Sequence, residues 1–136
     1  MNLDEIKELL TARIIFFLKP NLDKLHHYSI EDEGGKMEVI GATDDKVTSV
    51  FVLIRILISE EHRKIYITSL KLPDFMRHQG IGRKLIKVIY KLATELQFEV
   101  IITLMTDSFC ESMKKRGALE FGGPNSVKIA ESTMLE

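Results

Sequence analysis

The chain has 136 residues, of which 45% are hydrophobic and 29% are charged. These values are ordinary for one soluble globular domain and exclude the disordered and fibrous classes. The formal net charge of −1 excludes the strong positive field of a dedicated nucleic-acid or anionic-membrane binder. We therefore expect a single domain over residues 1–136 that binds neither nucleic acid nor membrane.

The cysteine content and the N-terminal segment bear on the compartment. The single cysteine, Cys110, excludes an intramolecular disulfide. The apolar run at residues 14–18 is far shorter than the ~20 residues that span a bilayer. Asp4, Glu5 and Glu8 precede this run, where a secretory signal would carry basic residues. We therefore expect a cytoplasmic protein.

The first third of the chain predicts mainly helix. Apolar residues spaced three and four apart predict a helix over residues 3–19, which Pro20 should end. The pattern also allows a second short helix over residues 22–28. Gly34-Gly35 then marks a turn.

The character changes to β over residues 36–72, which are rich in Val, Ile, Thr, Tyr and Phe. Strands are predicted over residues 37–42, 48–58 and 64–72. The links between them are short and polar, which favours antiparallel hairpins over crossover connections. This block is therefore predicted to be a meander.

The last third alternates between helix and strand. Helical periodicity predicts a helix over about residues 80–97, and the apolar run 98–105 is typical of a buried strand. A further helix over about 107–116 should end at Gly117, and a hairpin over 118–121 and 126–131 closes the chain. The predicted fold class is α+β, with a mixed, mostly antiparallel central sheet flanked by helices.

The segment with the clearest chemical signal is the turn from Arg77 to Gly82, which joins a predicted strand to a predicted helix. Glycines before a helix let a phosphate reach the unpaired backbone N–H groups of the first turn. This helix begins with Arg83 and Lys84, which the helix dipole disfavours unless an anion binds there. A tight turn with solvated basic side chains would give the same pattern, so both readings stay open here.

Two common nucleotide motifs do not fit this turn. A dinucleotide-binding GxGxxG would need a glycine where Leu85 stands. A P-loop would need Gly-Lys followed by Ser or Thr, and Gly82-Arg83-Lys84 does not provide it.

Residues 70–85, LKLPDFMRHQGIGRKL, resemble the strand, turn and helix of the GNAT acetyltransferases, whose hallmark is Arg/Gln-x-x-Gly-x-Gly/Ala. The resemblance extends over roughly residues 47–131. It implies that acetyl-CoA binds here as acyl donor, with its pantetheine arm along the strand and its pyrophosphate on the turn. The Leu72 N–H would polarise the thioester carbonyl. The implied acetyl-CoA-binding residues are Leu70, Lys71, Leu72, Arg77, His78, Gln79, Gly80, Ile81, Gly82, Arg83 and Lys84.

The resemblance leaves the catalytic side chains unknown. Acidic residues that the family often carries would fall at Thr68 and Ser69, its usual tyrosine at Met113, and an asparagine that often contacts pantetheine at Thr106. None of these four positions holds the family's residue. The remaining weak candidates are Glu60 and Glu61, with neighbouring His62, and Cys110. A solvated hairpin turn explains the first three equally well, and inert packing explains the cysteine.

The function implied by the resemblance is N-acetyltransferase activity. An acetyl or other acyl group would pass from acyl-CoA to a primary amine of an unidentified acceptor, by direct attack without a covalent intermediate. The alternative is a non-catalytic GNAT-like module that binds acyl-CoA or a partner protein. A nucleic-acid-binding domain is a third reading, which the neutral net charge disfavours. Its basic stripe would be Arg77, Arg83, Lys84, Lys87 and Lys91.

Partners and metals complete the expectations. The histidines lack the i, i+4 spacing of a helical metal pair, so we expect no metal. Acceptor specificity would lie in the first helices and in the loops near residues 29–35 and 59–64. The sequence is compatible with a homodimer.

Overall fold

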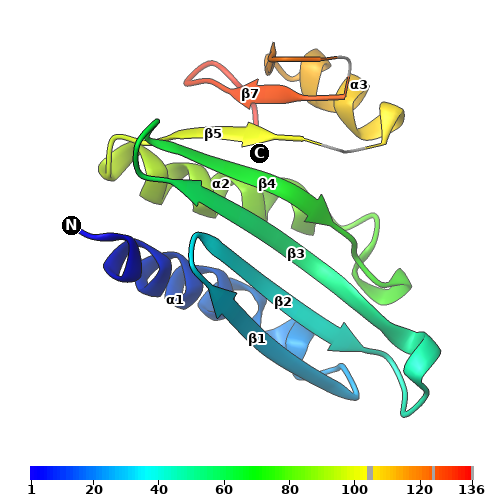
Figure 1. Cartoon of the computed structure of the whole chain (residues 1–136). Coiled ribbons are helices and arrows are strands. Elements are labelled where there is room, and N and C mark those ends of the chain that lie inside the picture. Colours follow the sequence, from blue (N-terminus) through cyan, green and yellow to red (C-terminus); the bar gives the residue numbers. More distant parts are fainter. Residues whose placement is uncertain (104–105, 124, 136) are drawn as a thin grey trace.

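A computed structural model describes residues 1–103, 106–123 and 125–135 of the chain (Figure 1). Three α-helices and a seven-stranded sheet make up its regular structure. In chain order the elements are α1 (Leu3–Leu22), β1 (His27–Glu33), β2 (Lys36–Ala42), β3 (Val50–Ser59), β4 (Lys64–Leu70), α2 (Ile81–Glu95), β5 (Glu99–Ile102), α3 (Asp107–Lys115), β6 (Leu119–Glu120) and β7 (Val127–Ile129).

The strands follow the spatial order β1-β2-β3-β4-β5-β7-β6. Strands β1 to β4 form an antiparallel meander, and β4 and β5 form a parallel pair joined by the crossover helix α2 (Figure 1). The two remaining pairs, β5 with β7 and β7 with β6, are antiparallel. The predicted α+β class with a mixed, mostly antiparallel sheet is confirmed.

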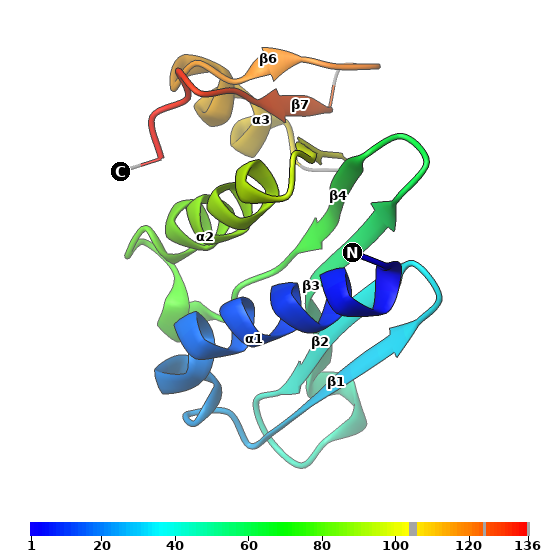
Figure 2. The same ribbon diagram turned by 90° about the vertical axis from the view of Figure 1, so that its left-hand side faces the viewer.

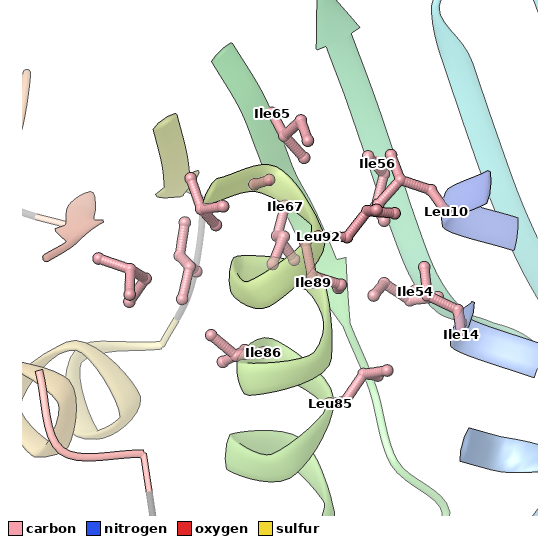
Figure 3. Packing of buried hydrophobic residues seen from close by; sticks show 14 of the residues in the cluster. Leu10, Ile14, Ile54, Ile56, Ile65, Ile67, Leu85, Ile86, Ile89 and Leu92 are labelled. Carbon is pink, nitrogen blue, oxygen red and sulfur yellow. The ribbon is translucent and has the colours of Figure 1, made fainter. Parts of the chain in front are cut away.

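All three helices lie on one side of the sheet (Figure 2). Alternate residues of the strands point to that side, as the pleat requires, and pack against apolar stripes of the helices. In Figure 3, Leu10 and Ile14 of α1 and Ile89 of α2 meet Ile54 and Ile56 of β3. The core is therefore a layer between the helices and one face of the sheet.

Helix α1 is longer than its sequence predicted. Asn2 caps it, because its side chain accepts from the Glu5 N–H at 2.9 Å. Pro20 lies inside the helix, so the expectation that it ends the helix was wrong. A proline removes one backbone donor, but the Asp23 N–H still reaches the Lys19 carbonyl at 3.0 Å. Burial of Leu22, 1% exposed, stabilises the added turn.

The second helix allowed over residues 22–28 is absent, because β1 begins at His27. Strand β1 pairs with β2 through the Gly34-Gly35 turn, as predicted for that turn. Polar side chains on both faces of β1 hid its alternation from the sequence. Tyr28 accepts a hydrogen bond from Lys19 at 3.3 Å, and Asp32 one from Lys7 at 3.4 Å.

The other predicted elements agree with the structure to within a few residues. Strand β3 starts at Val50, two residues later than expected, because residues 47–49 form a 3₁₀ turn. Strand β5 was expected to reach residue 105, and the end of that range lies outside the described residues. Gly117 ends α3 with a positive φ of 102°, which favours glycine.

The sheet face opposite the helices carries ion pairs that centre on the buried carboxylate of Glu38. Arg55 Nε lies 2.7 Å from Glu38 Oε2, and Lys36 Nζ lies 3.5 Å from the other carboxylate oxygen. The hydrogen bond from Arg55 lowers the pKa of Glu38 below its ordinary value. Within the described residues, none of the helices has the length and apolar character needed to cross a bilayer.

Candidate functional site

Strand β4 parts from β5 halfway along its length. The parallel pairing runs from Lys64 opposite Glu99 to Ile67 opposite Ile102. Within the described residues, the last hydrogen bond between the two strands is the one that the Thr103 N–H donates to the Ile67 carbonyl, at 2.9 Å. Strand β4 continues beside β3 as far as Leu70. Figure 1 shows β4 and β5 diverging toward their C-terminal ends.

A β-bulge sits where the two strands part. Ile67 pairs with Ile56 and Ser69 with Arg55, so Thr68 is the extra residue on β4. The Thr68 hydroxyl oxygen is buried and has no hydrogen-bond partner among the residues that the structure describes. An unsatisfied buried polar group costs about 1–3 kcal/mol. A ligand that offers a polar group at this point would recover part of that cost.

Backbone groups of two leucines point into the opening. The Lys71 N–H donates to the Leu53 carbonyl of β3 at 2.8 Å. Because successive residues of a strand direct their N–H and C=O groups to opposite sides, Leu70 and Leu72 direct theirs away from β3. Pro73 follows with φ −66° and ψ 162° and keeps the chain extended. The two leucine N–H groups and the Leu70 carbonyl can pair with an extended ligand as an added strand would, whereas the Leu72 carbonyl accepts from Arg77 Nε.

The loop between β4 and α2 is anchored at both ends. A short 3₁₀ helix, residues 74–76, inserts the fully buried side chain of Met76 into the core. Arg77 Nε donates to the Leu72 carbonyl at 2.9 Å, and Arg77 Nη1 lies 3.0 Å from Asp74 Oδ1. Gln79 Nε2 donates to the Phe75 carbonyl at 2.7 Å. The loop therefore holds its shape through its own side chains.

Helix α2 begins without a side-chain cap. Gly80 is the N-cap residue at φ 73°, and its carbonyl accepts from the Lys84 N–H at 3.0 Å. The first turn contains no acidic residue and carries Arg83 and exposed Lys84. His78 also has a positive φ, 62°, so the chain turns sharply before the helix. The first N–H groups of α2 and two cations thus face the same end.

Gly82 brings the helix start and the end of β4 together. A Cβ atom at this position would lie 3.6 Å from a Leu70 methyl carbon and 3.8 Å from a Leu72 methyl carbon. The uncapped helix terminus therefore lies directly beside the strand whose backbone groups face the opening. One continuous ligand could bind both features.

Two catalytic candidates from the sequence lie elsewhere. Glu60 and Glu61 belong to the hairpin between β3 and β4, at the start of β4, whereas the opening lies at its end. The six residue steps from Lys64 to Leu70 span about 20 Å. The structure therefore does not bring these carboxylates to Leu72.

The remaining candidates lie on α3 or at its start. Cys110 and Met113 are buried, with 2% and 1% of their surface exposed, and both pack in the core. Thr106, at the pantetheine-contact position of the resemblance, caps α3 by accepting the Phe109 N–H at 3.3 Å. Packing and capping therefore account for these three side chains.

The described residues show no group of three or more histidine, cysteine, aspartate or glutamate side chains able to hold a metal ion. His26 and His27 lie at the start of β1, and His62 is exposed in the β3–β4 hairpin. His78 stands in the turn before α2, apart from the other three.

Sequence reasoning missed two features of this site. The contact between Arg77 and the Leu72 carbonyl depends on how the loop folds back, which no spacing rule reveals. Thr68 was considered only as a failed base, whereas its buried hydroxyl is the polar group left unsatisfied at the bulge. The signal available in the sequence was the Thr68-Ser69 pair, which interrupts the apolar alternation between Ile67 and Leu70.

No protein-family model and no curated protein matches the chain. Among solved structures, nourseothricin acetyltransferase is 15% identical over 65% of this chain, with a TM-score of 0.44. The chain spans 52% of the length of that enzyme.

A second solved relative is an aminoglycoside acetyltransferase from an uncultured soil metagenomic sample. Its complex with sisomicin is 17% identical, covers 85% of this chain and 82% of that one, and has a TM-score of 0.41. Its complex with trehalose is 16% identical over 85% and 80%, with a TM-score of 0.38. At such TM-scores the overlap of the folds is partial, and the case for the site rests on the geometry of this chain.

Proposed function

We propose that the chain is an acyl-CoA-dependent N-acyltransferase of the GNAT type, which transfers an acetyl or other acyl group to a primary amine. The observation that carries this proposal is the contact of Gly82 with Leu70 and Leu72. It places a helix terminus without a side-chain cap beside a strand with outward-facing backbone groups. An acyl-CoA has the matching chemistry, with a pyrophosphate at one end of an extended amide-containing arm.

The pyrophosphate would bind at the start of α2. Gly80 and Gly82 leave the N–H groups of the first turn accessible, and the helix dipole favours negative charge there. Lys84, which is exposed, adds a cation to the rim. The pantetheine arm would follow β4, pairing with the outward-facing N–H groups of Leu70 and Leu72 and with the Leu70 carbonyl.

The reaction would proceed by direct attack. The amine nitrogen forms a bond to the thioester carbon, the bond from carbon to sulfur breaks, and a proton passes from the nitrogen to the departing thiolate. Negative charge grows on the carbonyl oxygen, and the Leu72 N–H would donate to it. One aimed donor of this kind is worth about 3 kcal/mol in the transition state. The chain would contribute mainly placement and polarisation.

The first test is calorimetric titration of the chain with acetyl-CoA. We expect saturable binding in the micromolar to millimolar range, and no binding at millimolar ligand would contradict the proposed site. A thiol-release assay against a panel of amines and lysine peptides then tests turnover. We expect release of free CoA only when an amine is present, without metal and without an acylated enzyme.

A second candidate function is a GNAT-like module that binds acyl-CoA or a partner protein without turnover. Two observations favour it: apolar Met113 is buried where the family often places its proton donor, and Thr106 is engaged in a helix cap. Binding of acetyl-CoA without thiol release for any amine would select this function. The predicted cytoplasmic location suits either function.

A further inference from the structure

Strand β1 forms one edge of the sheet and presents unpaired backbone groups on its outer side (Figure 1). Glu33 and Lys36 flank the two-residue hairpin turn, so they form a hydrogen-bonded pair. Alternation along β1 then directs the N–H and C=O groups of Tyr28, Ile30 and Asp32 away from β2. A regular, seven-residue edge strand of this kind is a template for pairing with another strand.

An apolar groove accompanies this edge. It lies between α1 and β1, has a volume of about 930 Å³, and is floored by Ala12, Ile15, Phe16 and Ile30. Phe16 is 87% exposed and Ile30 is 40% exposed. Charged and polar side chains complete its lining: Asp4, Lys7, Glu8, Thr11, Lys19 and Asp32. A phenylalanine this exposed, beside an unpaired strand, is typical of a surface that another chain covers.

The two ends of the edge differ in their balance of charge. Strand β1 starts with His27 and ends with Glu31, Asp32 and Glu33. Helix α1 runs the opposite way, because Lys7 contacts Asp32 and Lys19 contacts Tyr28. The same end of the edge therefore carries the acidic residues of both elements, Asp4 and Glu8 included. Among the described residues, Lys7 is the one basic residue of the groove lining at this end, and Lys19, paired with Asp23 at 2.9 Å, lies with the histidines at the other end.

We propose that β1 pairs antiparallel with β1 of a second copy of this chain, around a twofold axis at Ile30. In this register, Ile30 faces the partner's Ile30, and Tyr28 faces the partner's Asp32. His27 lies opposite the partner's Glu33. The histidine end of each strand meets the acidic end of the other, so the edge is complementary to itself.

Neighbouring registers are less favourable. A shift of two residues in one direction places Glu31 opposite the partner's Glu31, and like charges directly opposite each other destabilise a pair. A shift in the other direction centres the axis on Ser29 and separates the two Ile30 side chains. Pairing must shift in steps of two, because only alternate residues of β1 direct their backbone groups outward.

The helices support the same arrangement. The twofold axis at Ile30 brings the two α1 helices antiparallel above the joined sheet, with Phe16 and Ile15 near the axis. The acidic start of α1, with Asp4 and Glu8, then faces the end of the partner helix that carries the partner's Lys19. The groove has apolar residues at its centre and opposite charges at its two ends. In the proposed dimer, the same surface of the second copy covers it.

The first experiment compares two matched lysine substitutions by sedimentation velocity across the micromolar range. Ile30→Lys places a lysine on the axis of the proposed pair, and Leu57→Lys places one at an equally exposed position on the other face of the sheet. We expect the unsubstituted chain and Leu57→Lys to be dimeric and Ile30→Lys to be monomeric. A monomeric unsubstituted chain, or a dimer that survives Ile30→Lys, would overturn the proposal.

A charge exchange tests the register. Glu33→Lys places a lysine opposite the partner's His27, and His27→Glu places a glutamate opposite the partner's Glu33, so each variant alone should dimerise weakly. Mixed in equal amounts, the two variants form one lysine-to-glutamate pair and keep one histidine-to-glutamate pair. We expect the mixture to associate about fivefold more tightly than either variant alone at low salt. A mixture no tighter than its components would overturn the register.

Both experiments keep the proposal testable if a substitution impairs folding. Far-ultraviolet circular dichroism and thermal melting of each variant at low concentration show whether the monomer is folded. Cross-linking gives an independent measurement: Ile30→Cys should form a disulfide-linked dimer on mild oxidation, because facing residues lie within disulfide reach. Cross-linking of Ser29→Cys or Glu31→Cys in preference to Ile30→Cys would contradict the register.

Discussion

Helices α1 and α2 pack side by side on the same sheet, yet their N-termini are built in opposite ways. Asn2 and Glu5 close the start of α1 with a reciprocal capping box, and Asp4 adds a negative charge to its first turn. At the start of α2 the N-cap is Gly80, the first turn carries no acid, and Lys84 adds positive charge. Among the described residues, side chains cap the first terminus and none caps the second.

This difference identifies the helix start at which a bound ligand could accept hydrogen bonds from the backbone. Four N–H groups at a helix start lack partners within the helix, and a capping box satisfies two of them. The start of α2 leaves this role to another group, beside the buried Thr68 hydroxyl and the outward-facing backbone of Leu70 and Leu72. The start of α2, which no side chain caps among the described residues, therefore lies in the same region as the buried Thr68 hydroxyl and the outward-facing N–H groups of Leu70 and Leu72, whereas a capping box closes the start of α1.

The largest expected effect comes from filling the space at Gly82. In Gly82→Val the new side chain would pack against Leu70 and Leu72 at ordinary contact distances, so the fold should persist. It would also cover the approach to the helix N–H groups. We expect acetyl-CoA affinity to fall on the order of 100-fold, about 2.7 kcal/mol, by calorimetric titration.

Gly123→Val is the matched control, since a Cβ at Gly123 meets nothing within 4 Å. Its affinity for acetyl-CoA should equal that of the unsubstituted chain. Equal affinities for both valine variants would contradict the proposed pyrophosphate site.

Removing the Thr68 hydroxyl should separate stability from binding. Thr68→Val keeps the branched shape and deletes the buried oxygen, which has no hydrogen-bond partner among the described residues. We expect the ligand-free chain to gain about 1–2 kcal/mol in its free energy of unfolding, measured by urea denaturation, and acetyl-CoA affinity to fall. Thr68→Ser retains the hydroxyl, so it should keep the affinity. A destabilised Thr68→Val would show that the hydroxyl has a partner in the native chain.

The sequence predicted those parts of the fold that depend on periodicity and glycine chemistry. The stripe that includes Ile81, Leu85 and Leu92 placed α2, and the glycines at 80 and 117 marked a helix start and a helix end. These signals depend only on residues that are close together in the sequence, so they can be recognised without the structure. Strand β1 escaped prediction because its alternation depends on α1: Tyr28 and Asp32 are polar, yet they face the helix layer and bond to lysines there.

The candidate site divides in the same way. The turn around Gly80 could be proposed from its residues, because phosphate access at a helix start requires only neighbouring positions along the chain. The parting of β4 from β5 could not, since it depends on where the pairing of Ile67 with Ile102 ends. The distance of Glu60 from the opening also follows only from the direction of β4.

Removing the cap of α1 should affect stability alone. Asn2→Ala deletes the acceptor for the Glu5 N–H and one half of the capping box. We expect a loss of about 1 kcal/mol in the free energy of unfolding, with no change in acetyl-CoA affinity. Asn2→Ser, which can still cap, should lose much less. A change in affinity on Asn2→Ala would show that the two helix starts are coupled and would weaken the contrast between them.

The smallest expected effect comes from giving α2 an acidic first turn like that of α1. This change directly reverses the contrast between the two helix starts. Lys84→Glu places an acid beside the helix N–H groups, where the dipole favours it, so the ligand-free chain should become more stable by about 0.5 kcal/mol. The same acid should repel the pyrophosphate and lower acetyl-CoA affinity.

Lys91→Glu, an equally exposed change on the last turns of α2, should not stabilise the chain and should leave affinity unchanged. Thermal melting measures stability and calorimetric titration measures acetyl-CoA affinity for both variants. The proposed site requires that Lys84→Glu raise stability and lower affinity, and that Lys91→Glu do neither. Because solvent screening acts on both lysines alike, equal losses of affinity would assign the effect to net charge instead of the helix terminus.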